Sequence, residues 1–475
     1  MNKAVQVILP MLLMLIAVEH AHGQSLTPAA CHFGREVQAW QGQVNCYRMT
    51  VPENRQDPTT ADLDLAVYEI KARNDTDAAP VVYLAGGPGV SGSYYVNLLL
   101  RHPLREDRSI MILEQRGVGA SGELCPSVRR NYYRRVASRR DNNTRHRQFI
   151  GLLLNCFDAV QSDGRDIDGY TTDENAADVA DLRTALGLSR MDLWAISYGT
   201  VLAQAYMRSE PDHIGAVVFD ATVPIDYALE TGLTRNFRRV LDQRWTQCIA
   251  DGECDEGDQS FTTRLEEIIP EYNRRPLRLL GFSPEPSIVV NFVYVTGVDA
   301  AGIVFSLLYG QAPPEAIDRV LGFLERKSSS FLRAHYQRLA IPGFSFGMHY
   351  AVNCRGAEIG GEELAELRAE DPIFFDAMQV GFQYELCTNS DLGPVAITAN
   401  EAVDYSGRVL VLSGEFDPIT PLSVAEPFRE RFPNAGFLEI SGGGHGPSRS
   451  LPCAQVMVRN YFANPEAPVA DICGN

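Results

Sequence analysis

The sequence has no long apolar segment, internal repeat or low-complexity tract, and it has little positive charge. Its most apolar run, 4–18, is shorter than the ~20 residues that a transmembrane helix needs, and no later stretch resembles a membrane span. Among its 475 residues, 42 lysines and arginines stand against 60 aspartates and glutamates, a net charge of −18. So acidic a surface argues against nucleic acid or an anionic membrane as a partner. The hydrophobic share of 45% predicts a globular protein with a large core.

The first 23 residues have the features of a signal peptide. Lys3 supplies a positive start, the apolar run follows, and Ala21–Gly23 places small residues at the cleavage position. An uncleaved anchor is the alternative. No cysteine stands just after the cleavage position, so we expect no lipid or other membrane anchor after cleavage. These features predict an exported protein, periplasmic or extracellular.

The chain lacks CxxC and HxxxH spacings, and its acidic run 251–258 lacks the ligand spacing of a calcium loop. We therefore expect no metal. It does have ten cysteines, and an even number in an exported chain predicts disulfides. The sequence leaves their connectivity open. Pairing each cysteine with its nearest neighbour gives five short loops: 31–46, 125–156, 248–254, 354–387 and 453–473.

Short apolar strands alternate with helical periodicity at both ends of the chain, which predicts βαβ units and a mostly parallel sheet. The predicted strands are 63–71, 80–84, 109–113, 191–196, 214–219, 408–412 and 436–440. The helices expected between them are 175–188, 199–208, 421–432 and 453–462.

The middle of the chain has a different pattern. Between about 227 and 400 it is largely helical and lacks short buried strands, with helices expected at 262–272, 299–308 and 314–326. We predict an α/β fold with helices on both faces of the sheet, interrupted by a helical lid. The expected parts are the signal peptide (1–23), the core (24–226), the lid (227–400) and the rest of the core (401–475).

Ser197 is the predicted nucleophile, because Trp194–Thr200 joins a strand to a helix as a nucleophile elbow requires. The sharp turn demands small residues two positions on either side. Gly199 meets this demand, and Ala195 stands where glycine is usual. The elbow would place the hydroxyl at a helix N-terminus, whose N–H groups stabilise negative charge.

His445 is the predicted base, because it alone of the histidines follows a strand near the C-terminus, in a loop of three glycines. A serine hydroxyl needs such a base, and imidazole titrates near neutrality. His213 should lie at the opposite end of the sheet. His349, in the helical stretch, is the nearest rival as a substrate contact. The remaining histidines are His20, His22, His32, His102, His146 and His335.

Asp417 is the predicted acid that orients the imidazole, since it follows the strand 408–412 and precedes the histidine in the chain. Asp220, after the strand 214–219, is the alternative, and Glu415 is a weaker one. The oxyanion hole is assigned to the backbone N–H groups of Tyr198 and Gly87, with Gly86 as the second choice for the latter.

Four segments resemble the prolyl aminopeptidase and tripeptidyl aminopeptidase branch of the α/β-hydrolases. Gly86–Gly89 resembles the HGGPG loop of that branch, with Ala85 in place of histidine. Glu114–Ser121 resembles its DQRGxGxS segment, with Glu for Asp. Gly414–Pro421 is similar to its acid loop, and Cys248–Cys254 to a short disulfide loop in the lids of tripeptidyl-type members.

This resemblance, which runs from about residue 51 to the C-terminus, implies an α/β-hydrolase fold and the removal of residues from peptide N-termini without a metal or organic cofactor. It also implies that carboxylates, often from the lid, recognise the free α-amine. Val352–Glu358 resembles the lid segment that carries such an acid, although the acid usually lies closer to the cysteine, and Glu358 is the candidate. A carboxylesterase acting on neutral acyl esters with the same triad, and a binding protein with a decayed site, are the alternatives.

Overall fold

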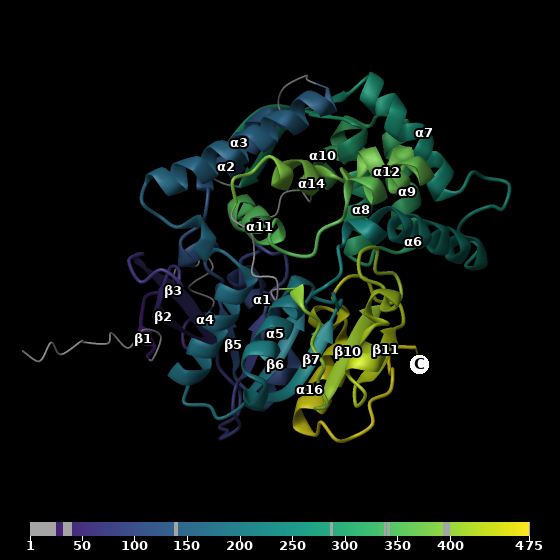
Figure 1. The fold of residues 1–475 in the computed structure, drawn as a ribbon. Helices are drawn as coiled ribbons and strands as arrows, with labels where there is room; N and C mark the ends of the chain where they lie inside the picture. Colours follow the sequence, from purple (N-terminus) through teal and green to yellow (C-terminus); the bar gives the residue numbers. More distant parts are fainter. Residues whose placement is uncertain are drawn as a thin grey trace, which may run out of the picture.

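The structure, a computed structural model, describes most of the chain, and the predicted signal peptide lies outside the described residues. The described residues are 25–31, 40–136, 141–285, 288–336, 339, 343–392 and 400–474. They form a sheet with helices on both sides, and a lid of mostly helical segments makes the upper layer in Figure 1.

Within this part of the chain, nine strands form one sheet in the order β1-β2-β3-β5-β4-β6-β7-β10-β11. Neighbours from β5 to β11 are parallel, whereas β1, β2, β3 and β5 pair antiparallel at one edge. The strands are β1 (Thr27–Pro28), β2 (Val44–Pro52), β3 (Asp62–Ile70), β4 (Val81–Leu84), β5 (Ile110–Leu113), β6 (Met191–Ile196), β7 (Ile214–Asp220), β10 (Val409–Gly414) and β11 (Gly436–Ile440). The mostly parallel sheet confirms the predicted fold class.

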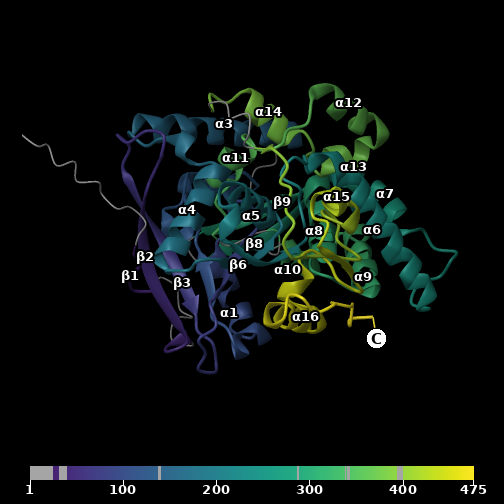
Figure 2. The same cartoon turned by 60° about the horizontal axis from the view of Figure 1, so that its bottom comes forward.

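The central strands are largely apolar because both faces of the sheet are covered. In β6, Leu193 and Ala195 pack on one face, and Trp194 and Ile196 on the other, as the alternation of a strand requires. Helices α4 (Thr172–Ala185), α5 (Tyr198–Ser209) and α15 (Phe428–Arg431) cover the first face. Helices α1 (Val96–Leu99) and α16 (Pro452–Ala463) cover the second, and Figure 2 shows them on the side away from α4.

The lid contains more than the predicted helical stretch. A hairpin of β8 (Leu277–Glu285) and β9 (Ile288–Val295) lies within it, and Leu279, Val293 and Val295 are buried, so the expectation that this stretch lacks buried strands was wrong. Its helices from residue 230 on are α6 (Glu230–Ala250), α7 (Phe261–Arg274), α8 (Gly297–Tyr309), α9 (Pro314–Glu325), α10 (Ser329–Tyr336), α11 (Phe346–Asn353), α12 (Gly361–Glu370), α13 (Pro372–Ala377) and α14 (Phe382–Thr388).

Two earlier helices, α2 (Pro126–Val136) and α3 (Asn142–Ser162), also belong to this layer. They lie between β5 and α4 in the chain, and the rings of Tyr132 and Phe149 contact Phe346 of α11 at centroid distances of 5.3 and 5.1 Å. They fall within the range expected for the core, 24–226, because only their aromatic contacts with later helices place them in the lid.

The five nearest-neighbour disulfides are all present. Three of them lie in the lid layer: 125–156 joins the start of α2 to α3, 248–254 closes the C-terminal end of α6, and 354–387 joins α11 to α14. The predicted helix 421–432 is instead a 3-10 turn, Leu422–Ala425, followed by α15, with Pro427, which lacks a backbone N–H, between them. Among the helices that the structure describes, none has the length and apolarity to cross a membrane.

Candidate active site

Ser197 occupies a strained turn between β6 and α5. Its backbone has φ 57° and ψ −127°, a conformation that non-glycine residues adopt at a cost of about 1–3 kcal/mol. Such strain is expected of a nucleophile elbow. The backbone of Gly199 passes so close to β4 that a Cβ atom there would lie 2.1 Å from the Leu84 carbonyl oxygen. The predicted demand for small residues therefore has a physical cause, and the side chain of Ser197 is left half-buried.

The structure brings His445 and Asp417 into direct contact. His445 Nδ1 lies 2.9 Å from Asp417 Oδ2 and 3.1 Å from Oδ1, and both side chains are buried. The N–H groups of Ile419 and Thr420 donate to Oδ1, at 2.8 and 2.9 Å, and Thr420 Oγ1 donates to Oδ2. Burial alone would raise the pKa of Asp417, but the nearby imidazole and these hydrogen bonds outweigh burial and lower it. The carboxylate is thus held ionised against the imidazole.

The alternative acids occupy different places. Asp220, at the end of β7, accepts a hydrogen bond from Ser448 N at 2.8 Å, and burial raises its pKa to about 6. It thereby holds the chain just beyond His445. Glu415 Oε2 accepts from Gly442 N at 2.9 Å and fixes the glycine-rich loop before the histidine. Of the three acids, Asp417 is the one hydrogen-bonded to His445.

Sheet topology gathers the three predicted residues at one edge. Ser197 follows β6, Asp417 follows β10 and His445 follows β11, and the carboxyl ends of parallel strands share one edge of a sheet. A Cβ atom on Gly446 would lie 3.1 Å from Ile196 Cγ2, so the histidine loop passes beside the elbow. Among the described residues, the hydrogen-bond partners of the His445 ring are Asp417 and Thr420, and Ser197 is not one of them. Serine–imidazole contacts are often long without substrate.

The 85–89 loop passes close to Ser197. A Cβ atom on Gly86 would lie 2.8 Å from Ser197 Cβ, which only glycine permits. Gly87 has φ +120°, and a Cβ there would meet the backbone nitrogens of Gly89 and Val90 at 2.8 Å. Gly87 lines a cavity together with Tyr198, so the two residues predicted for the oxyanion hole face the same space.

That cavity, of about 350 Å³, lies between the core and the lid. Its walls are mostly apolar, with Val201 and Ile225 on the core side and Phe305, Val352 and Phe382 on the lid side. Among the described lining residues, Glu230 at the start of α6 is the sole acid, and there is no lysine or arginine. Burial, and then the charge of Glu358, raise the pKa of Glu230.

Glu358, the acid suggested by sequence, is exposed and does not line this cavity, although its neighbours Gly356 and Ala357 do. The part of its carboxyl group that is shielded from water still raises its pKa. Glu230 was missed because it lies in no motif: it is the first residue of α6, and only the fold brings it to the cavity between the lid and the core. The rival contact His349 does line the cavity.

The lid contacts three loops that carry predicted site residues. From α6, Arg239 Nη2 donates to the Asp417 carbonyl oxygen at 2.7 Å and Asn236 Nδ2 to that of Ile419 at 3.0 Å. The ring of Tyr309, at the end of α8, lies 4.7 Å from the His445 ring. From α11, His349 Nδ1 lies 2.9 Å from the Pro88 carbonyl oxygen.

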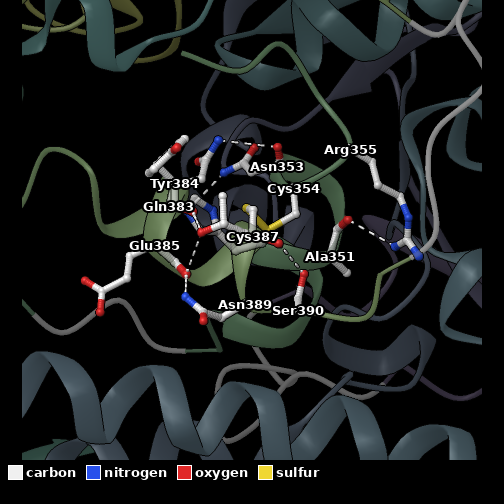
Figure 3. The surroundings of a disulfide bond; sticks show 12 residues. Ala351, Asn353, Cys354, Arg355, Gln383, Tyr384, Glu385, Cys387, Asn389 and Ser390 are labelled. Carbon is white, nitrogen blue, oxygen red and sulfur yellow. Dashed lines mark hydrogen bonds between the residues drawn. A yellow bond between two sulfur atoms is a disulfide. The ribbon is translucent and has the colours of Figure 1, made fainter. Parts of the chain in front are cut away.

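The disulfide between Cys354 and Cys387 links α11 to α14, which form two walls of the cavity (Figure 3). Asn353, before the first cysteine, and Gln383, on α14, both line the cavity, and Gln383 Nε2 donates to the Asn353 carbonyl oxygen at 3.3 Å. Among the described residues, no group of three or more histidine, cysteine or acidic side chains is placed to hold a metal ion.

Comparison with known proteins supports the fold. Residues 79–252 match the model of the alpha/beta hydrolase fold, and residues 373–473 match that of the TAP-like proteins. The chain is 26% identical over 201 residues to a tripeptidyl aminopeptidase of Streptomyces lividans, covering 38% of this chain and 35% of that protein. It is 25% identical over 253 residues to the serine protease Hip1 of Mycobacterium bovis, covering 49% and 46%.

The chain thus matches half or less of the length of these curated relatives. Among solved structures, an esterase from Rhodococcus sp. aligns with a TM-score of 0.41 and 16% identity, over 84% of this chain and 95% of that one. With its elbow, its sheet and the two family matches, the chain is a serine hydrolase of the α/β-hydrolase fold, with a TAP-like C-terminal region that resembles the prolyl and tripeptidyl aminopeptidases.

Proposed function

We propose that this serine hydrolase is an exopeptidase that removes residues from the N-termini of peptides. The observation that carries the proposal is Glu230, a half-buried carboxylate in a mostly apolar cavity whose described lining has no other charged acid or base. A buried charge without a partner is costly, so such a site favours a ligand that brings a cation. The free α-ammonium group of a peptide is a cation that stands at a fixed distance from the scissile bond.

The proposed chemistry uses Ser197, His445 and Asp417 as a triad. Ser197 Oγ attacks the carbonyl carbon while His445 takes the hydroxyl proton, and Asp417 holds the imidazole in one tautomer and stabilises its cation. The backbone N–H groups of Gly87 and Tyr198 donate hydrogen bonds to the negatively charged oxygen of the tetrahedral intermediate. His445 then gives its proton to the leaving amine, which completes the acyl-enzyme. In the second step His445 deprotonates a water molecule that attacks the acyl carbon. The acyl group leaves, and the proton returns to Ser197 Oγ.

Substrate recognition is assigned to Glu230, with Glu358 as a second carboxylate outside the cavity. Burial raises the pKa of Glu230, because a desolvated carboxylate loses hydration. An ammonium group beside it would reverse that penalty and lower the pKa. The apolar walls then take the side chains of the N-terminal residues, and a peptide with a blocked N-terminus would leave the carboxylate without a partner.

The test is a panel of aminoacyl and tripeptidyl anilides with free and N-acetylated termini. We expect free-amine substrates to be cleaved with a kcat/KM at least ten times higher, and Ser197→Ala to lower kcat by roughly 10⁶-fold. Equal rates, or faster cleavage of blocked substrates and neutral acyl esters, would replace this proposal with the carboxylesterase alternative. If fluorophosphonate leaves Ser197 unlabelled in the folded protein, catalysis by this serine is excluded.

We further propose that the chain is exported to the periplasm or the medium, that residues 1–23 are removed, and that no membrane anchor is left. The five disulfides support export, because such bonds persist in oxidising compartments. Partners are then peptides or small acyl compounds rather than nucleic acid. N-terminal sequencing of the protein released from cells should begin near Gln24, and a product beginning at Met1 would contradict removal of the segment.

A further inference from the structure

Three carbonyl groups of the 85–89 loop each accept a hydrogen bond from a donor in another segment. Gln115 Nε2 donates to the Ala85 carbonyl oxygen at 3.0 Å, and Ser345 N donates to that of Gly89 at 2.9 Å. The third anchor is His349 Nδ1, which lies 2.9 Å from the carbonyl oxygen of Pro88. One core residue and two lid residues therefore decide which way this loop faces.

The lid is in direct contact with this loop. A Cβ atom on Gly89 would lie 2.5 Å from the Ser345 carbonyl oxygen and 3.2 Å from His349 Cβ, so α11 and the loop have backbone-to-backbone contact. The carbonyl groups of Ala85, Pro88 and Gly89 face these partners. Gly87, which lies between them in the loop, lines the cavity with Tyr198.

The hydrogen bonds of His349 define its tautomer. A carbonyl oxygen can only accept, so Nδ1 carries the proton and donates to Pro88. Nε2 then accepts from Asn353 Nδ2, one helical turn later, at 3.2 Å. The ring is also fixed edge-on against Tyr350, with the centroids 4.7 Å apart at 85°. Burial lowers the pKa of His349 to about 4, which keeps the ring neutral at neutral pH and preserves this pattern.

We propose that His349 is a positioning residue through which the lid fixes the oxyanion hole: its Nδ1–H holds the Pro88 carbonyl and thereby aims the Gly87 N–H at the reacting oxygen. This inference rests on the proposed oxyanion hole, but not on the preference for free amines. His349 acts through the loop, a role different from the substrate contact that its place in the sequence suggested. The lid is then part of the catalytic framework as well as a cover.

Three substitutions separate the hydrogen bond from the bulk of the ring. In His349→Asn the amide nitrogen can occupy the position of Nδ1, whereas in His349→Gln it reaches only toward the position of Nε2. We expect His349→Ala and His349→Gln to lower kcat roughly tenfold with little change in KM, the effect of one lost positioning hydrogen bond. His349→Asn should retain most of the wild-type kcat. As a control, His213→Asn removes a histidine that lies by the Ser189 carbonyl, far from the site, and should leave kcat unchanged.

The rate constant for fluorophosphonate addition to Ser197 supplies a second readout. It depends on the oxyanion hole and not on an ammonium group, so it should fall in parallel with kcat in the alanine and glutamine variants. The proposal is overturned if His349→Ala reacts at the wild-type rate in folded protein, or if His349→Asn is as impaired as His349→Ala. If the wild type reacts with fluorophosphonate but fails to prefer free amines, the exopeptidase proposal fails while this one still stands to be judged by the variants.

Discussion

Glu230 has no counter-ion among the described residues that line the cavity, and in the proposed function this carboxylate binds the free amine of the substrate. In Glu230→Gln we expect kcat/KM for free-amine peptides to fall roughly 10- to 100-fold, the effect of losing one charge-assisted hydrogen bond. Hydrolysis of N-acetylated substrates should be unchanged or faster. Steady-state kinetics on the paired substrates of the panel would measure both.

Two further glutamates serve as controls for this substitution. Glu358→Gln should have a smaller effect, because the side chain is exposed and outside the cavity. Glu366→Gln, on the exposed face of α12, should have none. An equal loss on free and blocked substrates in Glu230→Gln would show that this residue supports the fold rather than the ammonium group.

Asp417 links catalysis to acid stability. Asp417→Asn should lower kcat by roughly 10⁴-fold, because the amide no longer enforces the catalytic tautomer of His445. The pKa of Asp417 is lowered in the folded protein, so the unfolded state binds more protons as the pH falls below the ordinary value of 3.8. The stabilisation from this group is therefore present above that pH and is lost as the pH falls through the folded-state pKa.

Urea unfolding between pH 2.5 and 7 would test this link. The free energy of unfolding of the wild type should decline more steeply below pH 4 than that of Asp417→Asn. Asp376→Asn, which removes an exposed carboxylate on α13, is the control and should follow the wild-type curve. Parallel curves for wild type and Asp417→Asn would contradict the assigned pKa direction.

At the scale of elements, α6 braces the loop that carries Asp417. Arg239 donates to the carbonyl oxygens of Asp417 and Glu415, at 2.7 and 3.2 Å. Arg239→Gln should lower kcat about tenfold while KM changes less than twofold, because the acid loses its backbone support but the cavity walls stay in place. Arg235→Gln, an exposed arginine on the same helix, is the matched control. An unchanged kcat in Arg239→Gln would mean that the hydrogen bonds around Asp417 hold the loop without the lid.

For the whole molecule, the disulfides decide how firmly the lid is assembled. The bond between Cys354 and Cys387 closes a span of 33 residues and joins two cavity walls. Replacing both cysteines by serine should cost about 3–4 kcal/mol of unfolding free energy and raise KM, since α11 and α14 could then move apart. Denaturant unfolding and steady-state kinetics would measure the two effects.

The bond between Cys248 and Cys254 offers a control of the same kind. It closes a span of only 6 residues, and neither cysteine lines the cavity. Its removal should cost less, about 2 kcal/mol, and should leave KM unchanged. If both double variants raised KM equally, the effect would reflect general loosening of the lid rather than the wall that the first bond holds.

The sequence by itself determined the features that depend on neighbouring residues. The elbow at Ser197, the parallel strands and the turns rich in glycine follow from local sterics and from the alternation of buried strands and helices, so their positions agree with the structure to within a few residues. The disulfide pairs could be proposed for a similar reason, because short loops bring neighbouring cysteines together.

Only the packing of distant segments determines which polar groups of the lid and the core lie next to one another. That α2 and α3 join the lid, that Glu230 rather than Glu358 faces the cavity, and that His349 reaches Pro88 all depend on packing between segments far apart in the chain. No periodicity or motif encodes such contacts. They arise when apolar helix faces are buried together, and the position of each polar side chain then follows from how those faces fit.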